Sequence, residues 1–150
     1  MPNTLEATVD ISASPEQVWQ VLSDLKRMPE FSPTTKRMIP LGTPAAGTWT
    51  ININRVEGKY VYPTTSRIVR YEPNREFAFR MNENGVVWSY TLEPIETGTK
   101  LVERRDIPNG VRRPVRMLIN AFLGGEQQFE AELVRGMNET LERIKATAER

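Results

Sequence analysis

The last third of the chain carries an apolar stripe that is too long for a protein to leave uncovered. Between residues 115 and 148, apolar side chains recur at steps of three, four and seven, which is the spacing of one helix face. The stripe consists of Val115, Leu118, Ile119, Phe122, Phe129, Leu133, Met137, Leu141, Ile144 and Ala148. An unbroken helix of this length would span roughly 50 Å and could not bury its apolar face alone. The sequence therefore predicts a long C-terminal helix packed on a broad partner surface.

Two adjacent glycines interrupt this stripe. Gly124 and Gly125 fall between Phe122 and Phe129, and a glycine inside a helix costs on the order of 1 kcal/mol relative to alanine. The pair is typical of a kink or a break into two helices. It is also typical of a point where the helix backbone approaches another group closely, and the two interpretations are compatible.

The preceding residues can supply the partner surface, because they show the period-two alternation of half-buried strands. The expected strands cover residues 5–11, 36–41, 48–57, 59–71, 77–81, 86–92 and 99–107. Short turns separate them, and consecutive strands joined in this way pair as an antiparallel meander. We therefore expect one α+β domain over residues 1–150, in which a curved antiparallel sheet of six or seven strands wraps the C-terminal helix.

Two short helices are predicted directly after the first strand. Ser14 is a favourable N-cap, Pro15 suits the first helical position, and Gln17 stands at the spacing of a capping box. A second short helix is expected to begin at Asp24 and to end near residues 29–33. We expect the two helices to pack as a hairpin or bent helix against the sheet.

The absence of two residue types restricts the chemistry of this chain. It contains no cysteine, which excludes disulfides, thiolate zinc sites and cysteine nucleophiles. It contains no histidine, which excludes Ser-His-Asp triads and most transition-metal sites. We therefore expect no metal and no cofactor, and any acid or base must be Asp, Glu, Lys, Tyr or an ordered water.

Charge and hydropathy argue against further classes. The formal net charge of +1 gives no overall attraction to nucleic acid. No apolar run approaches the roughly 20 residues of a transmembrane helix, and the first residues lack the basic and apolar regions of a signal peptide. We expect a cytoplasmic protein with no nucleic-acid partner.

Several short motifs, in a fixed order, resemble one superfamily. They are Ser14-Pro15-Glu16-x-Val18-Trp19, Pro29-Glu30-Phe31, Asn54, Tyr71-Glu72-Pro73-Asn74, Trp88-Ser89-Tyr90-x-Leu92 and Gly136-Met137-Asn138-x-Thr140-Leu141. In this order they resemble bacterial members of the START-like helix-grip superfamily (SRPBCC), in its polyketide cyclase/dehydrase and lipid-transport branch. Phe31 is a departure, because many relatives have Trp there, and we expect it to keep a packing role. The resemblance implies a helix-grip fold with an internal cavity for lipids, sterols, plant hormones or polyketides, but no shared catalytic signature.

Such a cavity would be lined by the inner face of the sheet and the near side of the helix. The expected lining residues are Asn54, Tyr62, Phe77, Phe79, Trp88, Tyr90, Arg105, Leu118, Ile119 and Phe122. Each apolar member is also typical of an ordinary core. Because one helix cannot fill a deep wrapped sheet, the geometry favours a ligand pocket.

The strand expected from Thr48 has two candidate inward faces. Hydrophobicity favours the face with Trp49, Ile51 and Ile53, whereas the resemblance favours the opposite face, with Asn54. Both faces cannot point inward unless a bulge intervenes. If Asn54 points inward, it is a hydrogen-bond anchor for a ligand oxygen.

The last strand places Glu103 and Arg105 on one face, between Leu101 and Ile107. The simpler interpretation is a structural ion pair. The alternative is a polar site at the base of the cavity, in which Glu103 is the best candidate acid or base. Burial would raise the pKa of Glu103 and Arg105 would lower it.

Three functions are consistent with these expectations. The first is binding or transport of a hydrophobic small molecule, lipid-like or aromatic, by a monomer or homodimer that contacts membranes transiently. The second is a polyketide cyclase or dehydratase that uses the same cavity. The third is a protein-interaction module.

Overall fold

The computed structural model describes residues 4–55, 61–83, 85–107 and 126–150, with side chains of the last range described from Glu130 onward. The elements in chain order are β1 (Leu5–Ile11), α1 (Pro15–Leu22), η1 (Leu25–Arg27), α2 (Met28–Phe31), β2 (Thr35–Pro40), β3 (Trp49–Arg55), β4 (Val61–Glu72), β5 (Glu76–Met81), β6 (Val87–Ile95), β7 (Gly98–Asp106) and α4 (Glu126–Ala148).

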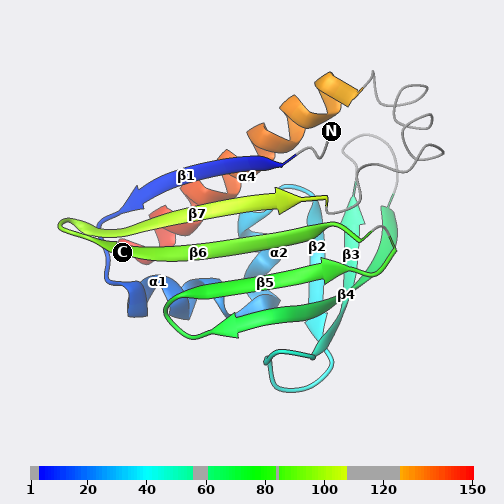
Figure 1. Ribbon diagram of the computed structural model, residues 1–150, viewed down its shortest axis with the longest axis horizontal. Coiled ribbons are helices and arrows are strands. Elements are labelled where there is room, and N and C mark those ends of the chain that lie inside the picture. Colours follow the sequence, from blue (N-terminus) through cyan, green and yellow to red (C-terminus); the bar gives the residue numbers. More distant parts are fainter. Residues whose placement is uncertain (1–3, 56–60, 84, 108–125) are drawn as a thin grey trace.

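All strands belong to one antiparallel sheet. Its seven strands follow the order β1-β7-β6-β5-β4-β3-β2, so β2 to β7 form a meander and β1 joins at the far edge beside β7. Figure 1 shows the helices together on one face of the sheet, which we call the inner face. This arrangement confirms the expected α+β helix-grip fold and its curved antiparallel sheet.

The first helix forms as its sequence predicts. The Ser14 hydroxyl accepts from the Gln17 amide, and the Gln17 side chain accepts from the Ser14 amide, which together form a capping box. The second helical segment begins at Leu25 as a 3₁₀ turn and continues as α2. Phe31, at the end of α2, is fully buried, so its expected packing role is confirmed.

The long C-terminal helix packs its apolar stripe against the start of the chain. Its buried residues include Met137, Leu141 and Ile144, and it contacts β1, α1 and α2. Lys145 Nζ donates to the Asp10 carbonyl at 3.0 Å, which ties the helix to β1. The expected helical turns before Glu126, and the Gly124-Gly125 interruption, lie outside the described residues.

The core lies between the inner face and the helices. The largest fully buried side chains include Phe31 from α2, Phe77 from β5, Ile68 from β4 and Leu22 from α1. Burial of side chains of this size is the main force that holds the helices on the sheet.

Strand β3 turns its polar side inward, so the hydrophobic interpretation of this strand was wrong. Thr50 and Asn52 are buried, whereas Trp49 and Ile51 are exposed on the outer face. The physical reason lies in the neighbouring strand β4, which offers hydrogen-bonding partners on the inner face. A buried polar group costs little when its hydrogen bonds are made.

Candidate functional site

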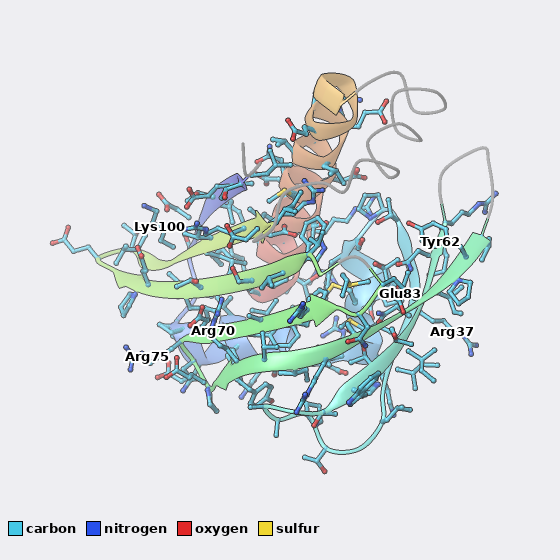
Figure 2. The ribbon with its side chains drawn as sticks, turned by 45° about the vertical axis from the view of Figure 1, so that its right-hand side comes forward. Arg37, Tyr62, Arg70, Arg75, Glu83 and Lys100 are labelled. Atoms are coloured by element: carbon cyan, nitrogen blue, oxygen red, sulfur yellow. The ribbon has the colours of Figure 1, made fainter. Side chains whose placement is uncertain are left out.

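Most of the inner face is fully buried, but one strip of it is partly exposed. We call this the inner strip, and its members come from four adjacent strands: Asn54, Tyr62, Thr64, Phe79, Met81 and Trp88. The register confirms their adjacency, because Asn54 stands opposite Tyr62 and Phe79 stands opposite Trp88. Figure 2 shows Tyr62 near one end of the sheet. A partly exposed inner strip is the part of this face that a ligand can contact.

Hydroxyl and amide groups form a connected cluster at one end of the strip. Thr50 Oγ1 donates to Asn52 Oδ1 at 3.0 Å and also bonds the Ser66 hydroxyl. Asn54 Nδ2 donates to Thr64 Oγ1 at 2.8 Å. The cluster supplies polar anchors for ligand oxygens beside otherwise apolar side chains. Asn54 therefore faces inward, as the resemblance implied.

Aromatic rings form the middle of the inner face. Phe77 stacks on Tyr90 with centroids 6.2 Å apart and lies 5.5 Å from the Phe79 ring. Phe77 and Tyr90 are buried and lie beside the strip on the same face. Phe79 and Trp88, which belong to the strip, are only partly buried. Paired aromatic rings of this kind hold one another in fixed orientations.

A buried carboxyl lies next to these rings on β7. Glu103 is 3% exposed and stands directly opposite Tyr90 in the register. The Tyr90 hydroxyl donates to Glu103 Oε2 at 3.0 Å, and within the described ranges Oε1 has no hydrogen-bond partner. The structure thus differs from the ion pair that we expected, because the partner of the Glu103 carboxyl is Tyr90 rather than Arg105.

Burial sets the charge of this carboxyl. It raises the pKa of Glu103 to about 8, and the hydrogen bond from Tyr90 offsets only part of the effect. Burial also raises the pKa of Tyr90 well above its usual value, reinforced by the neighbouring carboxyl. Near neutral pH both groups are therefore protonated, and Glu103 carries a proton that it can donate to an oxygen.

Arg105 shares the inner face with Glu103 and is also buried. It stands opposite Trp88, so it lies at the β7 border of the inner strip. A buried guanidinium of this kind is a fixed donor, because arginine does not lose its proton in proteins.

Seven of the ten expected lining residues lie on this one face: Asn54, Tyr62, Phe77, Phe79, Trp88, Tyr90 and, at the border of the inner strip, Arg105. Leu118, Ile119 and Phe122 lie outside the described residues. Thr64 and Met81 were not among the expected lining residues. Each of them alternates in phase with an expected lining residue, so the period-two pattern carried the signal.

A surface depression of 470 Å³ lies elsewhere, at the turn between β4 and β5. Its walls are Glu72, Asn74, Arg75, Glu76, Thr91, Leu92, Glu93 and Pro94. Four of its eight lining residues are charged.

Two further features bear on the choice of function. Within the part of the chain that the structure describes, no group of three or more acidic side chains is placed to hold a metal ion. None of the described helices is both long enough and apolar enough to cross a bilayer.

Comparison with known proteins gives one family. A sequence model described as polyketide cyclase / dehydrase and lipid transport matches residues 2–149. No curated protein matches the chain significantly.

Several solved structures have a similar fold. The polyketide cyclase-like protein Cgl2372 from Corynebacterium glutamicum is 26% identical with a TM-score of 0.68, and the match covers 97% of this chain and 91% of that one. The Zhui aromatase/cyclase from Streptomyces sp. R1128 is 20% identical with a TM-score of 0.73, covering 100% and 95%. The di-domain aromatase/cyclase StfQ of the steffimycin biosynthetic pathway is 15% identical with a TM-score of 0.79, and the match covers 99% of this chain. This chain spans about half of StfQ, 51% of its length.

Proposed function

Because the chain belongs to the polyketide cyclase / dehydrase and lipid transport family, we propose that it binds a hydrophobic small molecule against the inner strip and carries it. The observation that supports this proposal is the strip itself. It leaves Phe79, Trp88 and Tyr62 partly exposed beside the buried rings of Phe77 and Tyr90. Exposed aromatic side chains beside a few polar anchors are typical of small-molecule sites.

The polar groups around the strip favour a ligand that carries carbonyl or hydroxyl oxygens. The amide of Asn54 and the hydroxyl of Thr64 lie at one end. The protonated carboxyl of Glu103 and the guanidinium of Arg105 lie toward the other, on β7. The five adjacent strands from β3 to β7 span four inter-strand spacings, roughly 19 Å across the sheet. A lipid-like or aromatic, polyketide-like molecule of about this length fits both ends.

The test uses the intrinsic fluorescence of Trp88, titrated with a fatty acid, a sterol and an anthraquinone. We expect one of these ligand classes to give a saturable change in emission, because Trp88 contacts the ligand. The change should be retained in Trp49→Phe, since Trp49 lies on the outer face, and lost in Trp88→Phe. An equal change in both variants, or no saturable change with any ligand, would contradict the proposal.

A cyclase is the second candidate, and the observation that favours it is the protonated Glu103 beside the strip. In a ring closure, an enol carbon attacks a carbonyl carbon and forms the new C–C bond. The enol hydroxyl releases its proton to water, and the new alkoxide oxygen takes a proton from Glu103. Water then returns a proton to the carboxylate. A pKa of about 8 suits this exchange near neutral pH.

The variant Glu103→Gln separates the two candidates. Gln keeps the shape and can still accept the hydrogen bond from Tyr90, but it cannot donate an acidic proton. A carrier should keep its affinity for the ligand in this variant. A cyclase should keep binding and lose turnover on a poly-β-ketone substrate by roughly 10²–10⁴-fold, the usual contribution of a positioned acid.

The proposal includes the remaining expectations from the sequence. They are a single domain over residues 1–150, a cytoplasmic location, a monomer or homodimer, and transient contact with membranes. The last is developed below.

A further inference from the structure

The exposed large apolar side chains gather in one region of the sheet. Among the described residues, the exposed large hydrophobic side chains all belong to β2, β3 or β4, except Leu41, which directly follows β2. Trp49 is 47% exposed, Leu41 56% and Val61 59%. Ile39 and Ile51 are exposed as well. Single exposed apolar residues are ordinary, but a cluster marks an interaction surface.

The sheet register places Ile39, Leu41, Trp49, Ile51 and Val61 on the outer face, whereas Tyr62 belongs to the inner strip. Ile39 stands directly opposite Ile51 on the neighbouring strand. The Leu41 amide donates to the Trp49 carbonyl at 2.8 Å, which sets Leu41 beside Trp49. Partners across antiparallel strands share a face. We call this group of side chains the outer patch. It consists of Ile39, Leu41, Trp49, Ile51 and Val61 together with the arginines Arg37, Arg55, Arg67 and Arg80.

The same strands carry a concentrated positive charge. Residues 31–71 contain six basic residues and one acidic residue, although the formal net charge of the whole chain is only +1. On the outer face, the exposed arginines Arg37, Arg55 and Arg67 alternate with the apolar side chains, and Arg80 stands opposite Arg67 on β5. Figure 2 shows Arg37 and Tyr62 at the same end of the sheet, with Arg75 at the opposite end.

These arginines have no acidic partner among the described residues, whereas Arg27, Arg70, Arg104, Arg143 and Lys145 each form an ion pair there. Arg67 and Arg80 face each other directly, an arrangement that like charges disfavour. The carboxylate of Glu83 lies beside the patch, and it accepts hydrogen bonds from the amide and hydroxyl of Thr65. The patch therefore offers several cations to an external anion.

We propose that the outer patch docks on an anionic lipid bilayer, with Trp49 and its apolar neighbours at the headgroup level and the arginines on lipid phosphates. Aromatic and aliphatic side chains flanked by arginines have the composition of an interfacial membrane surface. The proposal goes beyond ligand binding, because the outer patch lies on the face of the sheet opposite the inner strip. Docking would hold the carrier where hydrophobic molecules partition.

Charge complementarity favours a bilayer over other occupants. A symmetric contact between two copies of this patch would set Arg37, Arg55 and Arg67 of one copy against the same cations of the other. A nucleic acid would attract the arginines but would leave Ile39, Ile51 and Leu41 with few suitable contacts, because its surface is mainly phosphate and sugar. An anionic bilayer satisfies both the apolar and the basic side chains.

The test is sedimentation of the full chain with vesicles of phosphatidylcholine, with and without phosphatidylglycerol. We expect binding to the anionic vesicles that weakens with added salt. Trp49→Ser should weaken it roughly tenfold. Arg67→Gln should weaken it about fivefold, the factor that corresponds to about 1 kcal/mol per basic residue near an anionic leaflet. Arg75→Gln, at the remote turn, is the matched control and should bind like the wild type.

Three results would overturn the proposal. The first is no binding to anionic vesicles by a protein that still binds ligand in the Trp88 titration, a result that leaves the proposed carrier function intact. The second is an equal loss of binding in Arg67→Gln and Arg75→Gln. The third is a dimer in light scattering that Trp49→Ser converts to a monomer, without vesicle binding by either. Circular dichroism of each variant checks its fold, and since Trp49 is exposed, its replacement leaves no buried cavity.

Discussion

The charge state of Glu103 should make the stability of this protein fall as pH rises toward mildly basic values. The folded protein holds the proton of Glu103 up to a pKa of about 8, whereas the unfolded chain loses it near 4.5. Between these two values the native state binds more protons than the unfolded state. The contribution of Glu103 to the free energy of unfolding therefore decreases by about 1.4 kcal/mol per pH unit between these two pKa values. Outside this pH range its contribution does not change with pH.

The variant Glu103→Gln removes this dependence, because an amide does not titrate. At about pH 5 the variant and the wild type should have nearly equal stability. At about pH 8 the variant should be the more stable by on the order of 5 kcal/mol, a large share of the 5–15 kcal/mol that holds a typical domain together. The hydrogen bond from Tyr90 survives in the variant, since the Gln oxygen accepts it.

The assay is urea unfolding of both proteins at intervals between about pH 5 and 9, extrapolated to water. The difference between the two curves cancels the titration of every other group. Glu6→Gln, which replaces an exposed carboxylate on β1, is the matched control. Parallel curves for wild type and Glu103→Gln would refute the reasoning, because they would mean that the buried carboxyl ionises at its ordinary pH.

Three further predictions concern packing and backbone conformation. Gly98 has φ +147°, and a Cβ there would lie 2.1 Å from the Ile11 carbonyl oxygen, so Gly98→Ala should lower the free energy of unfolding by at least about 3 kcal/mol in urea titrations. Ser14→Ala removes the N-cap of α1 and should cost about 1 kcal/mol by thermal unfolding. Phe77→Ala should lower the free energy of unfolding by about 3–5 kcal/mol, because the ring is fully buried. Phe79→Ala should lower it less but should weaken ligand binding in the Trp88 titration. If Phe79→Ala instead costs more stability than Phe77→Ala and leaves binding unchanged, Phe79 does not belong to the ligand surface.

Most elements of the fold could be predicted from local patterns. The first strand has the expected ends, the first helix begins at the expected residue, and the other expected strands differ from the observed ones by a few residues. Alternation and capping act between residues close in sequence, so a single chain displays them directly. The inward face of β3 could not be predicted in this way. Its polar residues are stable inside only because Ser66 and Thr64 on the neighbouring strand bond to them.

The candidate site, like the fold, could be predicted from local patterns only in part. The period-two pattern indicated that Glu103 and Arg105 share a face, and it grouped the aromatic residues of β5 and β6. It could not show that Tyr90, rather than Arg105, is the partner of Glu103, because this contact depends on the register between β6 and β7. The outer patch was missed because apolar residues on a half-buried strand are normally assigned to the core.

The pairing of β1 with β7 has a consequence for synthesis of the protein. β1 leaves the ribosome first, yet its neighbour in the sheet is the last strand to be made, and the Thr99 hydroxyl bonds to the Ala13 carbonyl 86 positions earlier. At translation rates of roughly 5–20 residues per second, the interval between the synthesis of β1 and that of β7 is on the order of 5–20 seconds. During that time its apolar residues are open to chaperones. The sheet can close only after β7 has been made, so mutations that slow this closure should reduce the yield of soluble protein in cells more than they reduce its measured stability.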